Sequence, residues 1–222
     1  VSYTEDNIRS LDWKEHIRMR PGMYIGKLGD GQAADDGIYV LLKEIIDNCI
    51  DEHAMGYGKS VRITIRDGEV KVRDFGRGIP LGKVVDVVSK INTGGKYDSR
   101  AFKKSVGLNG VGAKAVNALS TQFTVESYRE GEIKRALFKR GDLVNNEERG
   151  KTEERNGTMI AFRPDRDVFK AYSYRMEHVE QLLWKYAYLN TNLALYLNGV
   201  KFKSENGLKD LLTNDLDKGP RY

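Results

Sequence analysis

Acidic and amide side chains gather within residues 43–52, where the spacing of apolar residues predicts a helix. At about 100° per residue, one arc of this helix carries four oxygen-bearing side chains: Glu44, Asp47, Asn48 and Asp51. Such a group can hold a hard cation, and one carboxylate can act as a base. An ordinary solvated face of an amphipathic helix gives the same pattern, so this segment alone leaves both interpretations open.

A further acid, Asp74, ends a stretch with the alternation of a strand. Two valines at alternate positions before it share its face, so the carboxylate is predicted beside an apolar surface and needs hydrogen-bond donors. Asp74 either caps the following turn or pairs with Arg77, or it accepts a hydrogen bond from the amino group of a planar heterocycle. Such a ring would pack on Ile79 and Pro80.

Closely spaced glycines in residues 107–114 let backbone N–H groups converge on an anion, at the start of a predicted helix. A Walker A loop is excluded because Ala113, not Lys-Ser/Thr, follows Gly112. A dinucleotide-binding loop is excluded because the residues upstream do not form a buried parallel strand. A glycine-rich hinge without a ligand stays the alternative.

Three further residues give weaker signals. Lys96 and Lys103 lie upstream of the glycines, on what we expect to be a lid, and their cations could meet phosphates. Lysines on loops are more often only solvated. Thr158 begins a predicted strand, where its hydroxyl could reach a ligand or simply occupy the strand edge.

Composition narrows the class of protein. The chain has 222 residues, of which 40% are hydrophobic and 31% charged, as in a folded globular protein. No apolar run is long enough to span a bilayer, and no secretory segment opens the chain. The single cysteine, Cys49, excludes an internal disulfide and fits a cytoplasmic location. A net charge of +5 permits polyanionic partners without demanding them. We also expect these residues to belong to a longer protein.

The pattern of elements predicts an α+β fold, a sheet covered by helices on one side. Helices are expected at residues 11–19, 38–55, 81–91, 112–119 and 174–188. Hairpins are expected at 61–72, 123–139 and 193–202, a further strand at 158–162, and a charged mobile loop at 142–156. The Pro21-Gly22 pair is expected to break the first helix.

Four motifs coincide in order and spacing, at residues 20–26, 44–52, 74–80 and 107–120. Together they resemble the ATPase domain of the gyrase, Hsp90, histidine-kinase and MutL (GHKL) superfamily. The likeness runs from about Tyr3 to the end and is greatest to the B subunits of bacterial type II topoisomerases. It implies a Bergerat-type sandwich with a mixed, mostly antiparallel sheet. It also implies an arm and short helix at residues 1–20 and an ATPase domain at 21–222.

The resemblance implies ATP and Mg²⁺ as cofactors and assigns roles to single residues. Glu44 matches the general base, Asn48 the magnesium ligand, and Asp74 the acceptor of the adenine amino group. Thr158 matches a partner in the water network around adenine. The implied ATP-binding set is Tyr3, Asn48, Asp74, Arg77, Gly78, Ile79, Pro80, Lys96, Lys103, Gly107, Leu108, Asn109, Gly110, Val111, Gly112, Ala113 and Thr158.

Some positions carry particular expectations. Arg77 matches an arginine at the pocket rim that pairs with an acid, here Glu52. Tyr3 matches an arm tyrosine that reaches the nucleotide of the partner subunit. Two residues depart from the family pattern: Phe75 replaces a polar residue and is expected to alter the polarity of the pocket, and Asn109 replaces a common lid histidine.

The function implied is ATP-driven passage of one DNA duplex through another, in a full enzyme with an A-type cleavage subunit. Such proteins dimerise on binding ATP. We expect these 222 residues alone to be mostly monomeric and to turn over ATP weakly, because a lysine from a following domain completes the family's site. Overall likeness favours topoisomerase IV over gyrase.

The alternatives are a chaperone or mismatch-repair ATPase of the same superfamily, or a non-enzymatic basic module that binds nucleic acid. Because lysine and arginine are dispersed along the chain and nearly balanced by acids, we expect only weak, salt-sensitive DNA binding.

Overall fold

The strands form one mixed sheet in the computed structural model, which describes residues 11–90 and 110–217. Within these residues the sheet has nine strands in the order β5-β4-β3-β7-β2-β1-β8-β9, and β6 pairs with β4. The strands are β1 Ser60–Arg66, β2 Glu69–Asp74, β3 Ser120–Arg129, β4 Glu132–Lys139, β5 Asp142–Asn146, β6 Gly150–Lys151, β7 Gly157–Pro164, β8 Ala194–Leu197 and β9 Val200–Phe202. All neighbours are antiparallel except β1 and β8, which are parallel.

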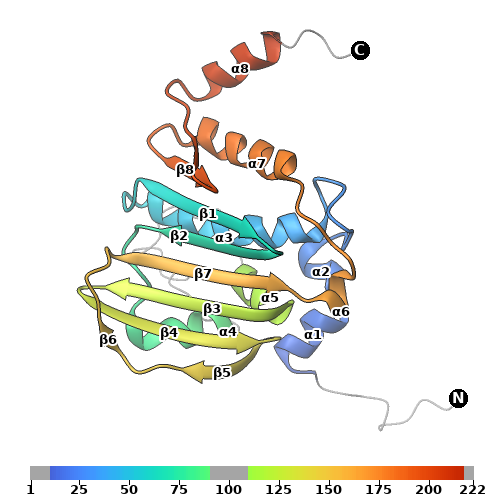
Figure 1. Cartoon of the computed structure of the whole chain (residues 1–222), viewed down its shortest axis with the longest axis vertical. Helices are drawn as coiled ribbons and strands as arrows, with labels where there is room; N and C mark the ends of the chain where they lie inside the picture. The colour runs from blue at the N-terminus through green and yellow to red at the C-terminus, as the bar shows by residue number, and fades with distance from the viewer. Residues whose placement is uncertain (1–10, 91–109, 218–222) are drawn as a thin grey trace, which may run out of the picture.

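The helices lie mainly on one side of this sheet. They are α1 Trp13–Met19, α2 Gly22–Ile25, α3 Gly37–Ala54, the 3-10 turn η2 Leu81–Lys83, α4 Val84–Ser89, α5 Gly112–Ala118, α6 Arg166–Phe169, α7 Met176–Leu189 and α8 Leu208–Asp217. In Figure 1, α3, α4 and α5 lie behind the strands, and the other face of the sheet is turned to the viewer. No helix in the described ranges is long and apolar enough to cross a membrane. The predicted arrangement, a sheet with helices on one face, is confirmed.

The core lies between the sheet and these helices. Alternate residues of β1 and β2 point into it, so Ile63, Val70 and Val72 are almost fully buried. The predicted hairpin at residues 61–72 is confirmed. Its turn places Asp67 and Gly68 at φ of 51° and 75°, the left-handed pair that suits the twist of a two-residue hairpin.

The charged segment after β4 departs from the sequence prediction. Residues 142–156 were expected to be a loop, but β5 and β6 both pair with β4. Every residue of β5 is exposed, so neither face of this edge strand leaves an alternating apolar pattern in the sequence. Backbone pairing with β4 holds it in the sheet, which hydrophobic periodicity cannot reveal.

The predicted break at Pro21-Gly22 is also only partly right. Helix α1 ends at Met19, but α2 begins at once, and Pro21 takes the N-cap position with helical φ and ψ of −59° and −33°. Proline is tolerated at a helix start because its missing N–H has no partner there. Helix α8 had no counterpart in the sequence prediction.

A buried carboxylate ties α1 to the strand layer. The Arg18 guanidinium donates to the Ala118 carbonyl at 2.9 Å and to Asp165 at 2.7 Å. Asp165 is 1% exposed, and it also accepts from the Asp167 backbone N–H at 3.0 Å. Burial alone raises the pKa of the Asp165 carboxyl, but the hydrogen bonds from Asp167 and Arg18 outweigh burial and hold the pKa below its usual value.

We therefore expect Asp165→Ala to lower the free energy of unfolding by about 3 kcal/mol, because Arg18 loses its buried partner. Asp142→Ala is the matched control: it removes an ion pair with Lys14, but Asp142 is 65% exposed, so the loss should stay below about 1 kcal/mol. Urea unfolding of both variants measures the difference. Equal losses would contradict the structural role of Asp165.

Candidate functional site

The four oxygen-bearing residues of α3 do not share one solvated face. Glu44 and Asn48 are half-buried, whereas Asp47 and Asp51 are 3% and 1% exposed. The interpretation of this arc as an ordinary solvated face is therefore wrong for the two aspartates. Asp47 accepts hydrogen bonds from the Tyr186 hydroxyl on α7 and from Lys43 Nζ, the latter at 2.5 Å. Asp47 thus anchors α3 to α7.

Tyr186 is a residue of this site that sequence reasoning missed. Burial and the hydrogen bond to Asp47 raise the pKa of its hydroxyl, because both disfavour the phenolate. Tyr186 lies on the apolar side of the predicted helix 174–188. A buried tyrosine hydroxyl needs a polar partner, so this position already indicated that another residue would bind the hydroxyl. The partner lies 139 residues away, on α3.

Asp74 lies at the end of β2 with its carboxylate turned toward the helices. It is 6% exposed, and its Oδ1 accepts from the backbone N–H of Gly76 at 2.8 Å and of Thr158 at 3.2 Å. Among the described residues, the one donor to Oδ2 is the Cys49 thiol, at 4.0 Å. Oδ2 therefore has acceptor capacity for a ligand. Asp74 caps the turn, as one of the sequence interpretations expected, and does not pair with Arg77.

Burial sets the electrostatics of Asp74. It raises the pKa of the carboxyl to about 6, although the hydrogen bonds from Gly76 and Thr158 favour the ionised form and limit the shift. The group is mostly ionised at neutral pH and protonated at mildly acidic pH. As a carboxylate it can only accept hydrogen bonds.

Arg77 pairs with Glu52, as the family resemblance implied. Two side-chain hydrogen bonds join them, Nη2 to Oε1 at 2.8 Å and Nε to Oε2 at 3.1 Å. The Arg77 guanidinium also lies 4.5 Å from the centre of the Tyr57 ring. A Cβ on Gly76 would lie 2.9 Å from Glu52 Oε2, so only glycine lets the turn pass this close to the ion pair.

The start of α5 lies against the acid of α3. A Cβ on Gly112 would lie 1.9 Å from Glu44 Oε2, so the Glu44 carboxylate reaches the backbone at the end of the glycine-rich segment. The structure thus brings together the first and third sequence segments singled out for chemistry. It also brings Thr158 to Asp74, through the Thr158 backbone N–H rather than its hydroxyl.

Phe75 does not lie beside Asp74. Side chains alternate along β2, and the Phe75 ring lies on the other face of the sheet, among the guanidinium groups of Arg62, Arg73 and Arg155. The expectation that Phe75 alters the polarity of the pocket is therefore wrong.

Of the other predicted site residues, some lie in the turn after β2 and some lie outside the described ranges. Ile79 is half-buried and Pro80 exposed in the turn after β2, where the Ser127 hydroxyl donates to the Ile79 carbonyl at 2.6 Å. Six predicted residues lie outside the described ranges: Tyr3, Lys96, Lys103, Gly107, Leu108 and Asn109.

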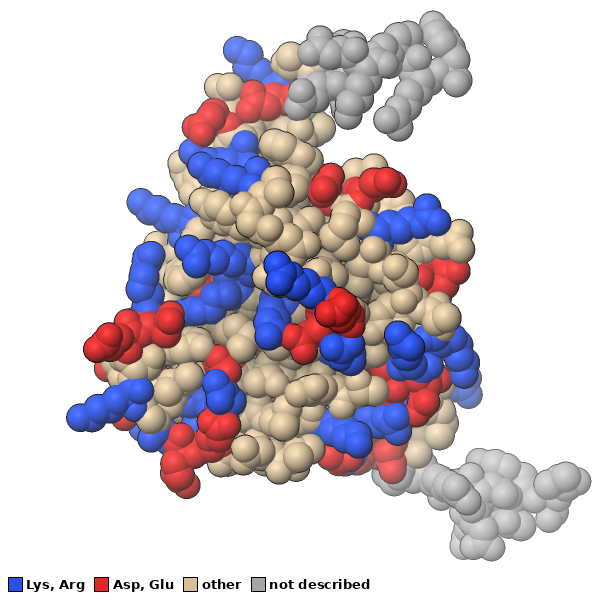
Figure 2. Space-filling model, in the orientation of Figure 1, with Lys and Arg blue, Asp and Glu red and all other residues tan. Residues whose placement is uncertain are grey.

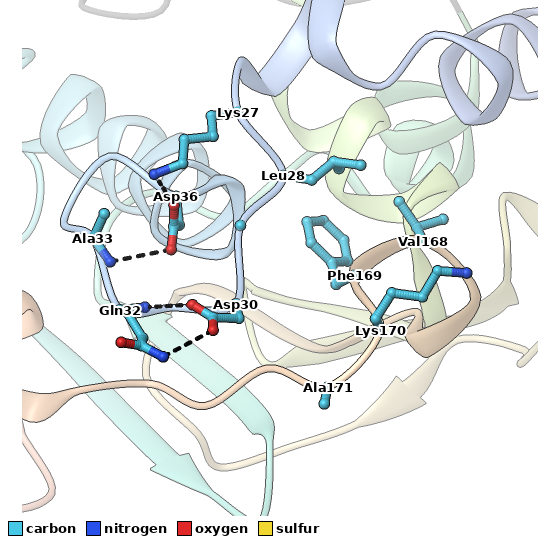
Figure 3. Close-up of a pocket in the computed structure, with 11 residues that line it drawn as sticks. Lys27, Leu28, Asp30, Gln32, Ala33, Asp36, Val168, Phe169, Lys170 and Ala171 are labelled. Atoms are coloured by element: carbon cyan, nitrogen blue, oxygen red, sulfur yellow. Dashed lines mark hydrogen bonds and ion pairs between the residues drawn. The ribbon is translucent and has the colours of Figure 1, made fainter.

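A pocket of about 500 Å³ lies elsewhere, between the loop before α3 and helix α6 (Figure 3). Lys27 Nζ lies 3.0 Å from Asp36 Oδ1 at its edge, and Phe169 contributes an apolar wall. None of the residues predicted for nucleotide chemistry lines this pocket.

Comparison with known families identifies the class of protein. The model of the histidine kinase-, DNA gyrase B- and HSP90-like ATPases matches residues 33–168, more than half of the chain. The chain belongs to this family.

Individual relatives are more specific. The chain is 50% identical over 215 residues to the B subunit of DNA topoisomerase 4 from Borreliella burgdorferi, covering 97% of this chain and 36% of that protein. It is 38% identical over 226 residues to the B subunit of the type 2 topoisomerase from Aquifex aeolicus, covering 95% of this chain and 28% of that protein. The chain therefore spans about a third of the length of these curated relatives.

A solved structure confirms the predicted fold class. The 43K ATPase domain of Thermus thermophilus gyrase B, in complex with an aminocoumarin, superposes with a TM-score of 0.76 at 30% identity. The match covers 93% of this chain and 55% of that one.

The raised pKa of Asp74 makes stability depend on pH. Because the folded pKa of about 6 exceeds the unfolded value of about 3.9, folding favours the protonated form. This contribution is complete below pH 4 and is lost as the pH rises through 6. Asp74→Asn keeps an acceptor for Gly76 and Thr158 but cannot ionise.

We therefore expect Asp74→Asn to gain about 2 kcal/mol in free energy of unfolding, relative to the unsubstituted chain, between pH 4 and pH 7. Urea unfolding across this range measures the difference, with exposed Glu132→Gln as the control. A difference that does not change with pH would contradict the assigned environment of Asp74.

Proposed function

We propose that these residues are the ATP-binding and ATP-hydrolysing part of the B subunit of a type II DNA topoisomerase. The observation that carries the proposal is the Asp74 carboxylate, buried, held by two backbone N–H groups and with Oδ2 available to a ligand. The identities of 36–50% to topoisomerase B subunits support this class over the chaperone or mismatch-repair ATPases of the superfamily.

Asp74 recognises adenine in this proposal. Its Oδ2 accepts a hydrogen bond from the exocyclic amino group, which the ionised form does at neutral pH. Ile79 and Pro80 in the neighbouring turn provide apolar surface for the ring, and Thr158 lies next to the carboxylate for contacts through water. Arg77 and Glu52 form a rigid pair at the rim.

Glu44 is the proposed general base. The oxygen of a water molecule attacks the terminal phosphorus of ATP, and its proton passes to the Glu44 carboxylate as the bond to the ADP oxygen breaks. The closeness of Glu44 to Gly112 supports this role, because it puts the base beside the segment proposed to hold phosphates. The anchor from Asp47 to Tyr186 fixes the helix that carries Glu44.

Asn48 is the proposed ligand of Mg²⁺. Its amide oxygen is a hard donor one helical turn from Glu44, which fits this ion. Mg²⁺ usually takes one or two protein oxygens together with substrate phosphates. Within residues 11–90 and 110–217 no cluster of three or more His, Cys, Asp or Glu is suited to hold a metal, so a site completed by phosphates is the arrangement these residues allow. The bound ion would offset phosphate charge.

The remaining contacts are proposed from the motifs. Gly110, Val111, Gly112 and Ala113, with Gly107, Leu108 and Asn109, form the phosphate cradle, and Lys96 and Lys103 approach the phosphates from a lid. Tyr3 belongs to an arm of residues 1–20, ahead of an ATPase domain of residues 21–222, and reaches the nucleotide of a partner subunit.

In the longer protein, ATP binding would drive dimerisation and passage of DNA, together with an A-type cleavage subunit, in the cytoplasm. The names of the relatives support this assignment. The relative from Borreliella burgdorferi is a B subunit of DNA topoisomerase 4, which favours that enzyme over gyrase for this chain.

We expect Asp74→Ala to abolish binding of a non-hydrolysable ATP analogue, because the adenine amino group loses its acceptor. Isothermal titration calorimetry measures the affinity, and exposed Glu132→Ala serves as the control. An unfolding midpoint within the range of the control excludes misfolding. Unchanged affinity in Asp74→Ala would overturn the adenine assignment.

Glu44→Ala should bind the analogue with an affinity within about threefold of the unsubstituted chain, while its kcat falls at least about 100-fold, the usual contribution of a general base. A phosphate-release assay measures turnover, and Glu177→Ala, on the first turn of α7, is the control. Retention of turnover would show that another group activates the water.

We further expect these 222 residues to be mostly monomeric with the analogue bound and to hydrolyse ATP slowly. Analytical ultracentrifugation and a steady-state assay test both points. A stable dimer with rapid turnover would contradict them.

A further inference from the structure

The sheet face turned away from α3, α4 and α5 carries basic side chains that the proposed nucleotide site leaves unused. Five residues, from β1, β2, β7 and the segment before β7, form what we call the arginine face: Arg62, Arg66, Arg73, Arg155 and Arg163. Within the described ranges, none of these five forms an ion pair with a carboxylate. In Figure 2, lysine and arginine side chains lie over this part of the sheet, with acidic side chains between them.

The strand register brings like charges together. Arg62 on β1 lies directly opposite Arg73 on β2, an arrangement that costs stability in the absence of a counter-charge. Tyr196 is the neighbour of Arg62 on β8, and Lys201 is the neighbour of Tyr196 on β9. Cations at this level of the sheet therefore lie on the adjacent strands β1 and β2, about 4.8 Å apart, and on β9 beyond Tyr196.

Phe75 organises the centre of this face. The guanidinium carbons of Arg62, Arg73 and Arg155 lie 5.3, 4.6 and 5.2 Å from the centre of its ring. Arg73 also lies 4.4 Å from the Tyr128 ring, so it sits against both aromatic residues. These rings hold the guanidinium groups in place and are themselves covered.

Nearby carboxylates do not neutralise the arginine face. Glu69 pairs with Lys71 at 3.0 Å. Glu126 is buried and pairs with Arg135 at 2.5 Å. Glu154 is exposed and acts on Arg73 only through the electrostatic field, without an ion pair.

We infer that the arginine face binds the sugar-phosphate backbone of duplex nucleic acid. Arg62, Arg66 and Arg155 are exposed, whereas Arg73 and Arg163 are half-buried and donate to backbone carbonyls. Guanidinium groups without carboxylate partners are suited to phosphate oxygens, and the spread of the five arginines over three strands matches an extended polyanion better than a single small anion. This surface is separate from the proposed nucleotide site, because alternate residues of β2 point to opposite faces, with Asp74 on the helix side.

Two other kinds of partner, single-stranded nucleic acid and protein, fit this face less well. Single strands bind through bases stacked on open aromatic rings, and here the rings are covered by guanidinium groups. Protein partners use exposed apolar anchors, and none of the exposed large hydrophobic side chains in the described ranges comes from β1, β2 or β7.

The test compares two double variants of equal charge. Arg62→Gln with Arg155→Gln removes two exposed members of the arginine face. Arg166→Gln with Arg175→Gln removes two exposed arginines elsewhere, on α6 and before α7. Fluorescence anisotropy with a labelled duplex of about 20 base pairs, at several salt concentrations, measures affinity without nucleotide.

We expect the Arg62/Arg155 variant to bind the duplex at least about 10-fold more weakly at low salt, and its slope of log affinity against log salt to fall by about two. The Arg166/Arg175 variant should bind like the unsubstituted chain. Equal affinities of all three proteins, equal losses in both variants, or no duplex binding at low salt would each overturn the inference.

Two competitors distinguish duplex nucleic acid from other polyanions that could bind the arginine face. Tighter binding of a single strand of the same length, or displacement of the duplex by an equal charge concentration of poly-glutamate, would overturn the duplex assignment. Calorimetry with the ATP analogue on the same variants keeps this test independent of the proposed function, since the analogue should bind all three proteins equally.

Discussion

The buried carboxylate of Asp74 is the constraint on which the site depends. A charge removed from water needs donors, and in the described ranges Oδ1 of Asp74 accepts from two backbone N–H groups, those of Gly76 and Thr158, which are far apart in sequence. Both donors are present only if the turn after β2 is tight and β7 lies beside β2. The position of the carboxylate, the turn and the strand order therefore support one another.

Local patterns in the sequence predicted most elements around this site. The long helix and the hairpin at residues 61–72 follow from the spacing of apolar residues, and the pairing of Arg77 with Glu52 follows from the family motif. Strand β5 was missed because all its side chains are exposed, so its place in the sheet depends on backbone pairing alone.

The features that the sequence did not predict depend on contacts between distant segments. The hydrogen bond from Tyr186 to Asp47 and the parallel pairing of β8 with β1 each depend on how the chain returns after residue 164. Arginines that look dispersed and nearly balanced by acids in the sequence become neighbours, because strands far apart in the chain lie side by side. The spacing of residues along the chain does not predict this strand register.

Strand β2 carries two unlike surfaces within six residues, Asp74 on one side and Arg73 on the other. Inserting or deleting a single residue in this strand would turn every following side chain to the opposite face. The length of β2 is therefore fixed more strictly than its composition. Across related proteins, this predicts substitutions within the strand without any change in its number of residues.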